Sequence, residues 1–246
     1  PNINKNNFKE VIIQNSEKKV IITIKLSSKN YAFIKELEKE IKKIFVDFSI
    51  KVYVNEKLIF SLGENYFLKK EFNIVYPFTN NSFYQINDEV KNIVYQQILN
   101  FIDGGEEVVD AYSGSGLLSA IISKKAKHVT GIEINKISTN NAEKLKKENK
   151  LDNLTNINGD SAVELNKLNF DICVLDPPRA GVNKKVIKSL LDKKPKKIIY
   201  LSCNPATLAR DLSLLINNYK ITYIRPFDMF PQTHHVETLV CLTNIK

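Results

Sequence analysis

The chain has 246 residues, of which 43% are hydrophobic and 26% are charged, as in an ordinary globular protein of one large or two modest domains. Three cysteines without a C-x-x-C pair exclude a disulfide framework and a cysteine-rich metal site, and the absence of about 18 continuous apolar residues excludes a membrane span. A net charge of +9 favours a polyanionic partner, nucleic acid before a membrane surface, although heavy use of Lys, Asn and Ile from an AT-rich coding sequence explains it equally well.

The first third of the chain predicts a small α+β domain over residues 1–80. Strands are expected at Val11–Ile13 and Val20–Ile24, and apolar residues at helical spacing predict a helix over Tyr31–Phe45. Two further strands, Ser49–Val54 and Lys57–Phe60, meet at a turn before the segment ends near Phe78. The opening residues contain no hydrophobic signal region, so we expect a cytoplasmic protein.

From residue 81 to residue 246 strands and helices alternate, which predicts a doubly wound, Rossmann-like α/β domain. Asn87 is expected to cap a helix that ends near Ile102. The last two strands, Ile221–Ile224 and Glu237–Leu242, have only a loop between them, so the sheet is expected to end antiparallel. The expected elements between these are strands at 108–109, 129–132, 154–157, 172–175 and 198–201, and helices at 119–125, 138–150, from 184 and at 205–218.

A glycine-bearing turn, Asp110–Gly116, follows the first strand of this domain and opens a helix. Glu133 ends the next strand, about 20 residues further on, where an acidic side chain suits a ribose diol. The turn has neither the third glycine of a dinucleotide site nor a G-K-[ST] sequence for a triphosphate. S-adenosylmethionine has ribose hydroxyls and no phosphate, so it fits the turn better. Asp160, after the third strand, is then expected near the adenine amino group. The alternative is that the glycine turn is a plain strand–helix connection without a ligand.

A carboxylate and a thiol follow two later strands, in Asp176-Pro177-Pro178-Arg179 and Ser202-Cys203-Asn204-Pro205. Ligands bind at the carboxyl ends of parallel strands, so both side chains are expected to face one crevice. A thiolate that adds to carbon 6 of a uracil activates carbon 5 for methyl transfer, and a base must then remove the carbon 5 proton. Glu237 is the candidate base, while Cys203 and Glu237 also have plain structural interpretations.

No metal site is expected. His234 and His235 are adjacent and therefore lack the i, i+4 spacing of a helical zinc pair, and no third ligand lies nearby in the sequence.

The chain resembles the S-adenosylmethionine-dependent RNA uracil-5-methyltransferase family in six segments that follow one another in register. The resemblance implies that Gln85, Tyr112, Glu133 and Asp176 contact the cofactor or hold the site, that Cys203 is the nucleophile and that Glu237 accepts the proton. Gly114 of the glycine turn and Asp160 are further expected cofactor contacts, and Asp176 is also a catalytic candidate. The resemblance also implies a Rossmann-like methyltransferase domain behind a smaller central domain. The matching segments are 81–87, 110–116, 132–133, 176–181, 202–211 and 228–237.

Family members commonly begin with an oligonucleotide-binding barrel, and many carry an iron–sulfur cluster on four cysteines; this sequence contains neither pattern. The form of Asp228–Thr233 resembles ribosomal-RNA members more than transfer-RNA members. We therefore expect an RNA substrate, with ribosomal RNA favoured over transfer RNA. We also expect the protein to be a monomer.

RNA contacts are expected from basic and aromatic side chains. Arg179, Arg210 and the Lys-rich stretches 144–147 and 193–194 are candidate phosphate contacts, although the last is more typical of a solvated helix face. Phe83, Tyr84 and Phe230 are candidates for stacking on an extruded base, or for the core.

Two other functions stay open. The first is an exocyclic-amino methyltransferase, which also uses a D-P-P turn and needs no cysteine. The second is a non-catalytic RNA-binding scaffold that has kept the fold.

Overall fold

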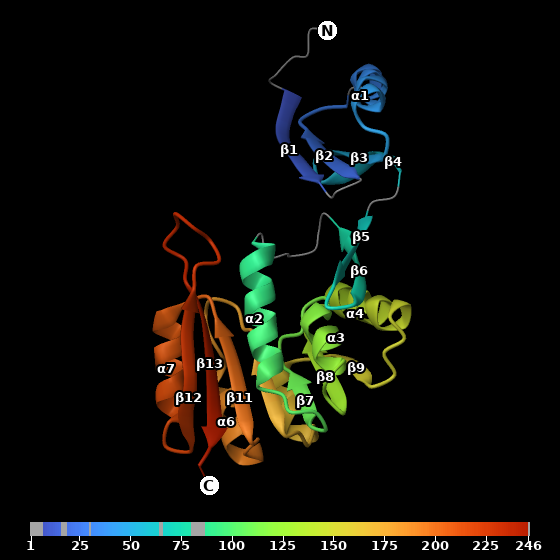
Figure 1. Ribbon diagram of the computed structural model, residues 1–246. Coiled ribbons are helices and arrows are strands. Elements are labelled where there is room, and N and C mark those ends of the chain that lie inside the picture. Colours follow the sequence, from blue (N-terminus) through green and yellow to red (C-terminus); the bar gives the residue numbers. More distant parts are fainter. Residues whose placement is uncertain (1–6, 16–18, 30, 64–65, 80–86, 246) are drawn as a thin grey trace. The chain divides into compact units, whose positions relative to one another are not determined.

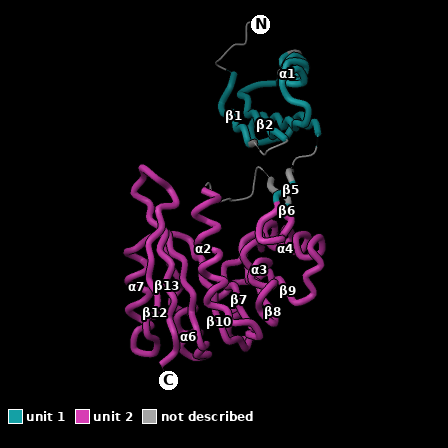
Figure 2. The backbone as a smooth tube through the Cα atoms, in the orientation of Figure 1, with its two compact units in different colours: residues 1–69, 76–82 teal, residues 70–75, 83–246 magenta. Residues whose placement is uncertain are grey.

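The computed structural model describes residues 7–15, 19–29, 31–63, 66–79 and 87–245. The chain divides into two compact units, one formed by residues 1–69 and 76–82 and the other by residues 70–75 and 83–246 (Figures 1 and 2). The α+β and α/β classes expected from the sequence are confirmed, including the antiparallel end of the larger sheet.

The smaller unit contains a four-stranded sheet in the order β1-β2-β3-β4, with one helix. Strand β2 pairs in parallel with β3, and the chain crosses between them through the helix, as parallel pairing requires. Alternate residues of β2, Ile22, Ile24 and Leu26, form the core with Ile34 and Ile41 of the helix. The elements are β1 (Phe8–Asn15), β2 (Val20–Leu26), α1 (Tyr31–Ile44), β3 (Phe48–Val54) and β4 (Lys57–Leu62).

A two-stranded sheet of β5 (Tyr66–Glu71) and β6 (Ile74–Thr79) follows, which the sequence pattern did not predict. Its turn places Phe72 and Asn73 at φ 48° and 62°, the left-handed values of a tight hairpin turn. Phe–Asn is not one of the Asn–Gly type pairs that announce such a turn, which explains the missed hairpin. The hairpin is held by Asn149, whose side chain accepts a hydrogen bond from Val75 N (2.7 Å) and donates one to Val75 O (2.5 Å).

The larger unit contains a seven-stranded sheet in the order β12-β13-β11-β10-β7-β8-β9, in which β13 runs in the direction opposite to that of the other six strands. Helix α3 contacts α4, and α6 contacts both α5 and α7, so the helices form two groups (Figure 1). Right-handed crossovers place such groups on opposite faces of a doubly wound sheet. The elements are α2 (Asp88–Asn100), β7 (Glu107–Asp110), α3 (Leu117–Ser123), β8 (His128–Glu133), α4 (Lys136–Glu148), β9 (Leu154–Asn158), α5 (Ser161–Glu164), the 3-10 turn Leu165–Lys167, β10 (Ile172–Leu175), α6 (Lys184–Lys193), β11 (Lys197–Ser202), α7 (Pro205–Leu215), β12 (Tyr219–Phe227) and β13 (Glu237–Asn244).

Side chains just ahead of the helices define where they begin. Asn87 caps α2 by accepting a hydrogen bond from Val90 N at 3.2 Å, as the sequence predicted. Asn135, Asn183 and Asn204 cap α4, α6 and α7 in the same way. Helix α7 is shorter than expected, because its last turn ends at Leu215 and not at Asn218.

The chain order of the strands reverses between β7 and β10, which are neighbours in the sheet. Such a switch point leaves a crevice at the carboxyl ends of the strands. In the described part of the chain no helix has the length and apolar character needed to span a bilayer.

The glycine turn between β7 and α3 generates a stability prediction. Gly116 has φ +85°, and an added Cβ would lie 2.6 Å from Ala142 Cβ, whereas Gly114 has φ +54° and no atom within 4 Å of an added Cβ. Gly116→Ala is expected to lower the free energy of unfolding by about 2–4 kcal/mol, through backbone strain and overpacking, and the matched Gly114→Ala by about 1–2 kcal/mol. Urea unfolding of both variants measures the difference, and equal losses would contradict the close contact with α4.

Candidate active site

Five strands of the larger sheet bring the predicted site residues to one edge. Tyr112 follows β7, Glu133 ends β8, Asp160 follows β9, Asp176 follows β10 and Cys203 follows β11. Glu237 begins β13, and because β13 is antiparallel, its first residue lies at the edge where the parallel strands end.

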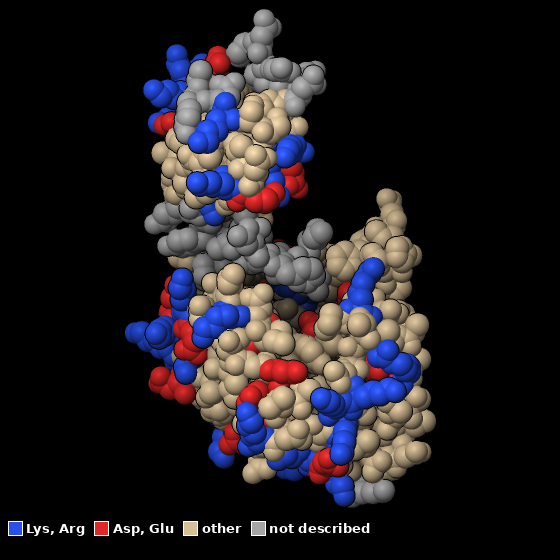
Figure 3. Space-filling view, turned by 180° about the vertical axis from the view of Figure 1, so that it is seen from behind, with Lys and Arg blue, Asp and Glu red and all other residues tan. Residues whose placement is uncertain are grey.

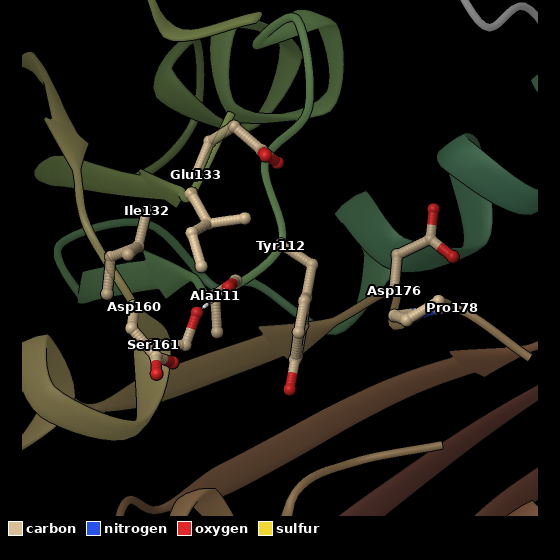
Figure 4. Close-up of a pocket in the computed structure, with 9 residues that line it drawn as sticks. Ala111, Tyr112, Ile132, Glu133, Asp160, Ser161, Asp176 and Pro178 are labelled. Carbon is tan, nitrogen blue, oxygen red and sulfur yellow. Dashed lines mark hydrogen bonds between the residues drawn. The ribbon is translucent and has the colours of Figure 1, made fainter. Parts of the chain in front are cut away.

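A cavity of about 330 Å³ opens at this edge. Four predicted residues line it: Tyr112, Glu133, Asp160 and Asp176. In Figure 4 Tyr112 lies between Glu133 and Asp160 on one side and Asp176 on the other. The sequence did not single out the other lining residues, because they are small or apolar. These are Ala111, Ile132, Ile134, Ser161 and Pro178.

Glu133 is oriented by two peptide N–H groups. Gly114 N donates to one carboxylate oxygen at 3.0 Å, and Asn135 N donates to the other at 2.7 Å. Gly114 is therefore placed as the residue that holds Glu133, and it does not itself line the cavity. Gln85 lies outside the described residues.

Asp160 and Ser161 form the wall of the cavity next to β9. The Asp160 carboxylate accepts a hydrogen bond from Ala162 N at 2.9 Å and so begins the short helix α5. Ser161 Oγ donates to Ala111 O, which ties this wall to the end of β7 (Figure 4).

Tyr112 presents a neutral phenol to the cavity. Burial raises the pKa of Tyr112 to about 12, although a backbone hydrogen bond from Asn183 opposes the shift. At neutral pH the side chain is therefore an uncharged hydrogen-bonding group.

The strand register brings Cys203 and Glu237 together. Ser202 of β11 pairs with Thr238 of β13. Cys203, which follows Ser202, and Glu237, which precedes Thr238, therefore lie side by side at the sheet edge. The Cys203 side chain is half-buried, whereas Cys173 and Cys241 are buried. Glu237 is only 3% exposed, and burial raises its pKa, with the Arg179 charge opposing the shift.

The site contains more acidic than basic side chains. Burial raises the pKa of Asp176 to about 8, and the charges of Glu237 and Asp110 add to the shift. Burial also raises the pKa of the Cys203 thiol, as do Glu237 and Asp176, whereas Arg179 lowers it. Arg179 is therefore the cation that favours a thiolate at Cys203.

Asp110 is a site carboxylate that sequence reasoning left without a role. It is 1% exposed, accepts a hydrogen bond from Ser119 Oγ at 2.6 Å, and burial raises its pKa to about 6. Its position as the first residue of the glycine turn was visible in the sequence, but its proximity to Asp176 was not.

The loop between β12 and β13 contributes aromatic groups above Arg179. The Arg179 guanidinium donates to His235 Nε2 at 2.8 Å, and the His235 ring stands edge-on to Phe230 with centroids 6.0 Å apart. Burial lowers the pKa of His235, and Arg179 and His234 add to this. The described residues contain no group of three or more potential metal-ligating side chains.

The candidate phosphate contacts differ in whether their side chains already bind groups of the protein itself. Arg210 pairs with Asp211 at 2.7 Å and donates to Ala180 O at 2.9 Å, so its guanidinium is used within the protein. The lysines of 144–147 and 193–194 lie on α4 and at the end of α6. In Figure 3, Lys and Arg side chains gather toward the sides of the larger unit, with Asp and Glu among them.

Comparisons with known proteins agree with this geometry. Residues 156–245 match the family model described as tRNA (Uracil-5-)-methyltransferase, and residues 90–198 match the one described as Methyltransferase small domain. An uncharacterized RNA methyltransferase of Mycoplasma mobile is 44% identical over 168 residues, 68% of this chain and 46% of that protein. One of Fusobacterium nucleatum is 35% identical over 245 residues, 95% of this chain and 52% of that protein.

The solved structures include a similar enzyme with a bound ligand. The tRNA (uracil-54, C5)-methyltransferase of Pyrococcus abyssi, in complex with S-adenosyl-L-homocysteine, superposes with a TM-score of 0.80 at 25% identity, covering 96% of this chain and 60% of that one. The chain spans about half the length of the curated relatives named above.

The charges around Cys203 predict opposite effects of two substitutions on its reactivity. Glu237→Gln removes a negative charge that raises the pKa of Cys203, so the pH midpoint of its alkylation is expected to fall. Arg179→Met removes the cation, so the midpoint is expected to rise. Iodoacetamide labelling against pH, followed by mass spectrometry, measures both shifts; Cys203→Ala is the control for the buried thiols, and unchanged midpoints in both variants would contradict the charge arrangement.

Proposed function

We propose that this chain, which is similar to RNA methyltransferases, uses S-adenosylmethionine to methylate carbon 5 of a uridine in RNA through a transient bond between Cys203 and the uracil ring. One observation carries the proposal: the half-buried thiol of Cys203 and the buried carboxylate of Glu237 follow from paired strands at the sheet edge where the cavity opens. An enzyme that methylates an exocyclic amine needs neither group in that place.

The residues that line the cavity fit S-adenosylmethionine. Glu133 suits the ribose diol, Asp160 the adenine amino group, and Ile132 and Ile134 the apolar faces of the adenine. Tyr112 and Asp176 complete the proposed cofactor contacts, with Gln85 proposed from the resemblance. When bound, the cofactor supplies an electrophilic methyl group.

In the proposed first step the Cys203 thiolate bonds to carbon 6 of the uracil, and the electron pair of the 5,6 double bond moves toward the carbonyl at carbon 4. Carbon 5 becomes nucleophilic and would take the methyl group of a bound S-adenosylmethionine, whose methyl–sulfur bond breaks to leave S-adenosylhomocysteine. Arg179 supports this step, because its charge favours the thiolate against Glu237 and Asp176.

In the second step Glu237 removes the remaining proton from carbon 5. The electrons of that bond re-form the 5,6 double bond, and the Cys203 sulfur leaves as a thiolate. Burial raises the pKa of Glu237, which makes its carboxylate a stronger proton acceptor than an exposed one. Asp176, which lines the cavity and also acts on the Cys203 thiol, is proposed to hold the cofactor side of the site.

Ribosomal RNA is the substrate proposed first, from the form of Asp228–Thr233, and transfer RNA is the second candidate. The net charge of +9 supports a polyanionic substrate. The target base must leave its stack to reach Cys203, and we propose that Phe230, His235 and Arg179, which contact one another, receive it. Mapping 5-methyluridine in ribosomal and transfer RNA from cells lacking the gene decides between the two.

The remaining alternatives make different demands on the same site. An exocyclic-amino methyltransferase would keep its activity after Cys203→Ala. A non-catalytic scaffold would not bind S-adenosylhomocysteine in isothermal titration calorimetry, even as a folded sample.

The covalent step is tested with RNA that contains 5-fluorouridine. Fluorine replaces the proton that Glu237 would remove, so the methylated ring is expected to stay bound to the wild-type protein and to appear as an adduct on denaturing gels and in mass spectra. Cys203→Ala is expected to give no adduct. Full adduct formation by Cys203→Ala would remove Cys203 from the mechanism.

The proton-transfer step is tested by Glu237→Gln on ordinary RNA. The amide cannot accept the carbon 5 proton, so the methylated covalent complex is expected to accumulate, and turnover to fall by about 10²–10⁴-fold. Free product at the normal rate would assign the base role to another group. Glu237→Asp, which keeps the carboxylate but shortens it, is the matched control and is expected to turn over faster than Glu237→Gln.

A further inference from the structure

Asp211, on the second turn of α7, is a buried carboxylate with hydrogen-bond donors on both oxygens. It is 1% exposed. Val182 N and Tyr200 Oη donate to one oxygen, each at 2.8 Å, and the Arg210 guanidinium donates to the other, through Nε at 2.8 Å and Nη2 at 2.7 Å. A buried carboxylate needs such donors, because it has lost its hydration.

One of these contacts reaches the loop between β10 and α6, which carries Arg179, and Arg210 makes a second contact with the same loop. Val182 belongs to this loop, and Arg210 Nη2 also donates to Ala180 O at 2.9 Å. Gly181 lies between them with φ +78°, and an added Cβ would come within 2.6 Å of both Arg210 Nη2 and Asp211 Oδ2. The loop backbone is therefore pressed against the Asp211–Arg210 pair.

The same loop is attached to the residues that follow Cys203. Asn204 Nδ2 and Thr207 Oγ1 each donate to Arg179 O at 3.3 Å. The main-chain groups of Arg179, Ala180 and Val182 are thus all bound by side chains of α7 or of its cap residue Asn204. The helix that begins next to the thiol also holds the loop that carries the cation.

We propose that Asp211 is a positioning residue that, with Arg210, fixes the loop 178–182 on α7 and so keeps Arg179 beside Cys203. The purpose of this role rests on the proposed function, because a reactive Cys203 thiolate is needed for addition to the uracil ring. Asp211 does not line the cavity and is not among the charges that act on Cys203, so we infer that it acts on the thiol through the loop that carries Arg179.

The charges that act on the thiol make this role measurable. Among the described residues, the charged groups that perturb Cys203 are Glu237 from β13, Asp176 from the end of β10, and Arg179 from the loop. Asp211 and Arg210 are not among them. A substitution at either position therefore leaves these three charges in place and changes the reactivity of Cys203 only if Arg179 moves.

The test compares variants of the full chain in two assays. The first is the pH profile of Cys203 alkylation by iodoacetamide, and the second is single-turnover methyl transfer to RNA. In Asp211→Asn the amide nitrogen must face either Arg210 or Val182 N, both of which are donors, and Arg210→Gln removes the link to Ala180. Both variants are expected to shift the alkylation midpoint to higher pH. Methyl transfer is expected to slow by about 100-fold, with the affinity for S-adenosylhomocysteine unchanged.

Tyr200→Phe is the matched control. It removes a donor to Asp211 Oδ2, the oxygen that also accepts from Val182 N, but Tyr200 is not part of the loop. It is expected to keep the wild-type alkylation profile and methyl-transfer rate. Arg210 is exposed enough for Arg210→Gln to stay folded, as circular dichroism checks, even if Asp211→Asn does not fold. A wild-type alkylation midpoint in folded Arg210→Gln, or an equal shift in Tyr200→Phe, would overturn the proposal.

Alkylation requires no RNA and no cofactor, so the two proposals fail separately. If the wild-type protein forms no adduct with 5-fluorouridine RNA, uracil-5 methylation fails, while the alkylation profiles still decide the role of Asp211. If the adduct forms and the profiles do not move, only the role of Asp211 fails.

Discussion

The antiparallel pairing of β13 with β11 is the constraint on which the candidate site depends. The other neighbours of β11 and β10 are parallel, so their last residues meet at one edge and their first residues at the other. Only a strand of opposite direction can bring its first residue to the carboxyl edge. The register that pairs Ser202 with Thr238 therefore joins Cys203 to a carboxylate 34 residues later in the chain. One register step would move Glu237 to the other face of the sheet and separate the two groups.

The chemistry of the site follows from charges that have lost their hydration. Asp110, Asp176 and Glu237 all have raised pKa values with burial as the main cause, and the Arg179 charge opposes the shift of Glu237. Such an arrangement disfavours a thiolate at Cys203, so the position of Arg179 decides how reactive the thiol is. The charge balance thus makes the loop 178–182 as important as the residues that contact a substrate.

In both the loop 178–182 and the glycine turn 110–116, a glycine allows the main chain to lie close to neighbouring side chains. In the turn, Gly114 donates its N–H to Glu133, while Gly116 adopts a left-handed conformation against Ala142 of α4. In the loop, Gly181 lets the backbone lie against Asp211 and Arg210. In both places a glycine lets a main-chain segment approach a neighbouring helix or carboxylate closely, so that a charged side chain is held in one position.

The sequence by itself determined the alternation of strands and helices, the caps such as Asn87, and the strand ends at which Glu133, Asp160, Asp176 and Cys203 stand, because these depend on local patterns of polarity and on turn-forming residues. It missed the β5–β6 hairpin, whose Phe72–Asn73 turn has no strong local signal, and it did not indicate that Arg210, a candidate phosphate contact, pairs with Asp211. Only the tertiary structure decided that Asp110 and Asp176 share an environment, that Glu237 is buried and that Arg179 acts on Cys203. Those properties depend on strand order, register and burial, which are set by contacts between segments distant in the chain and not by the residues next to each side chain.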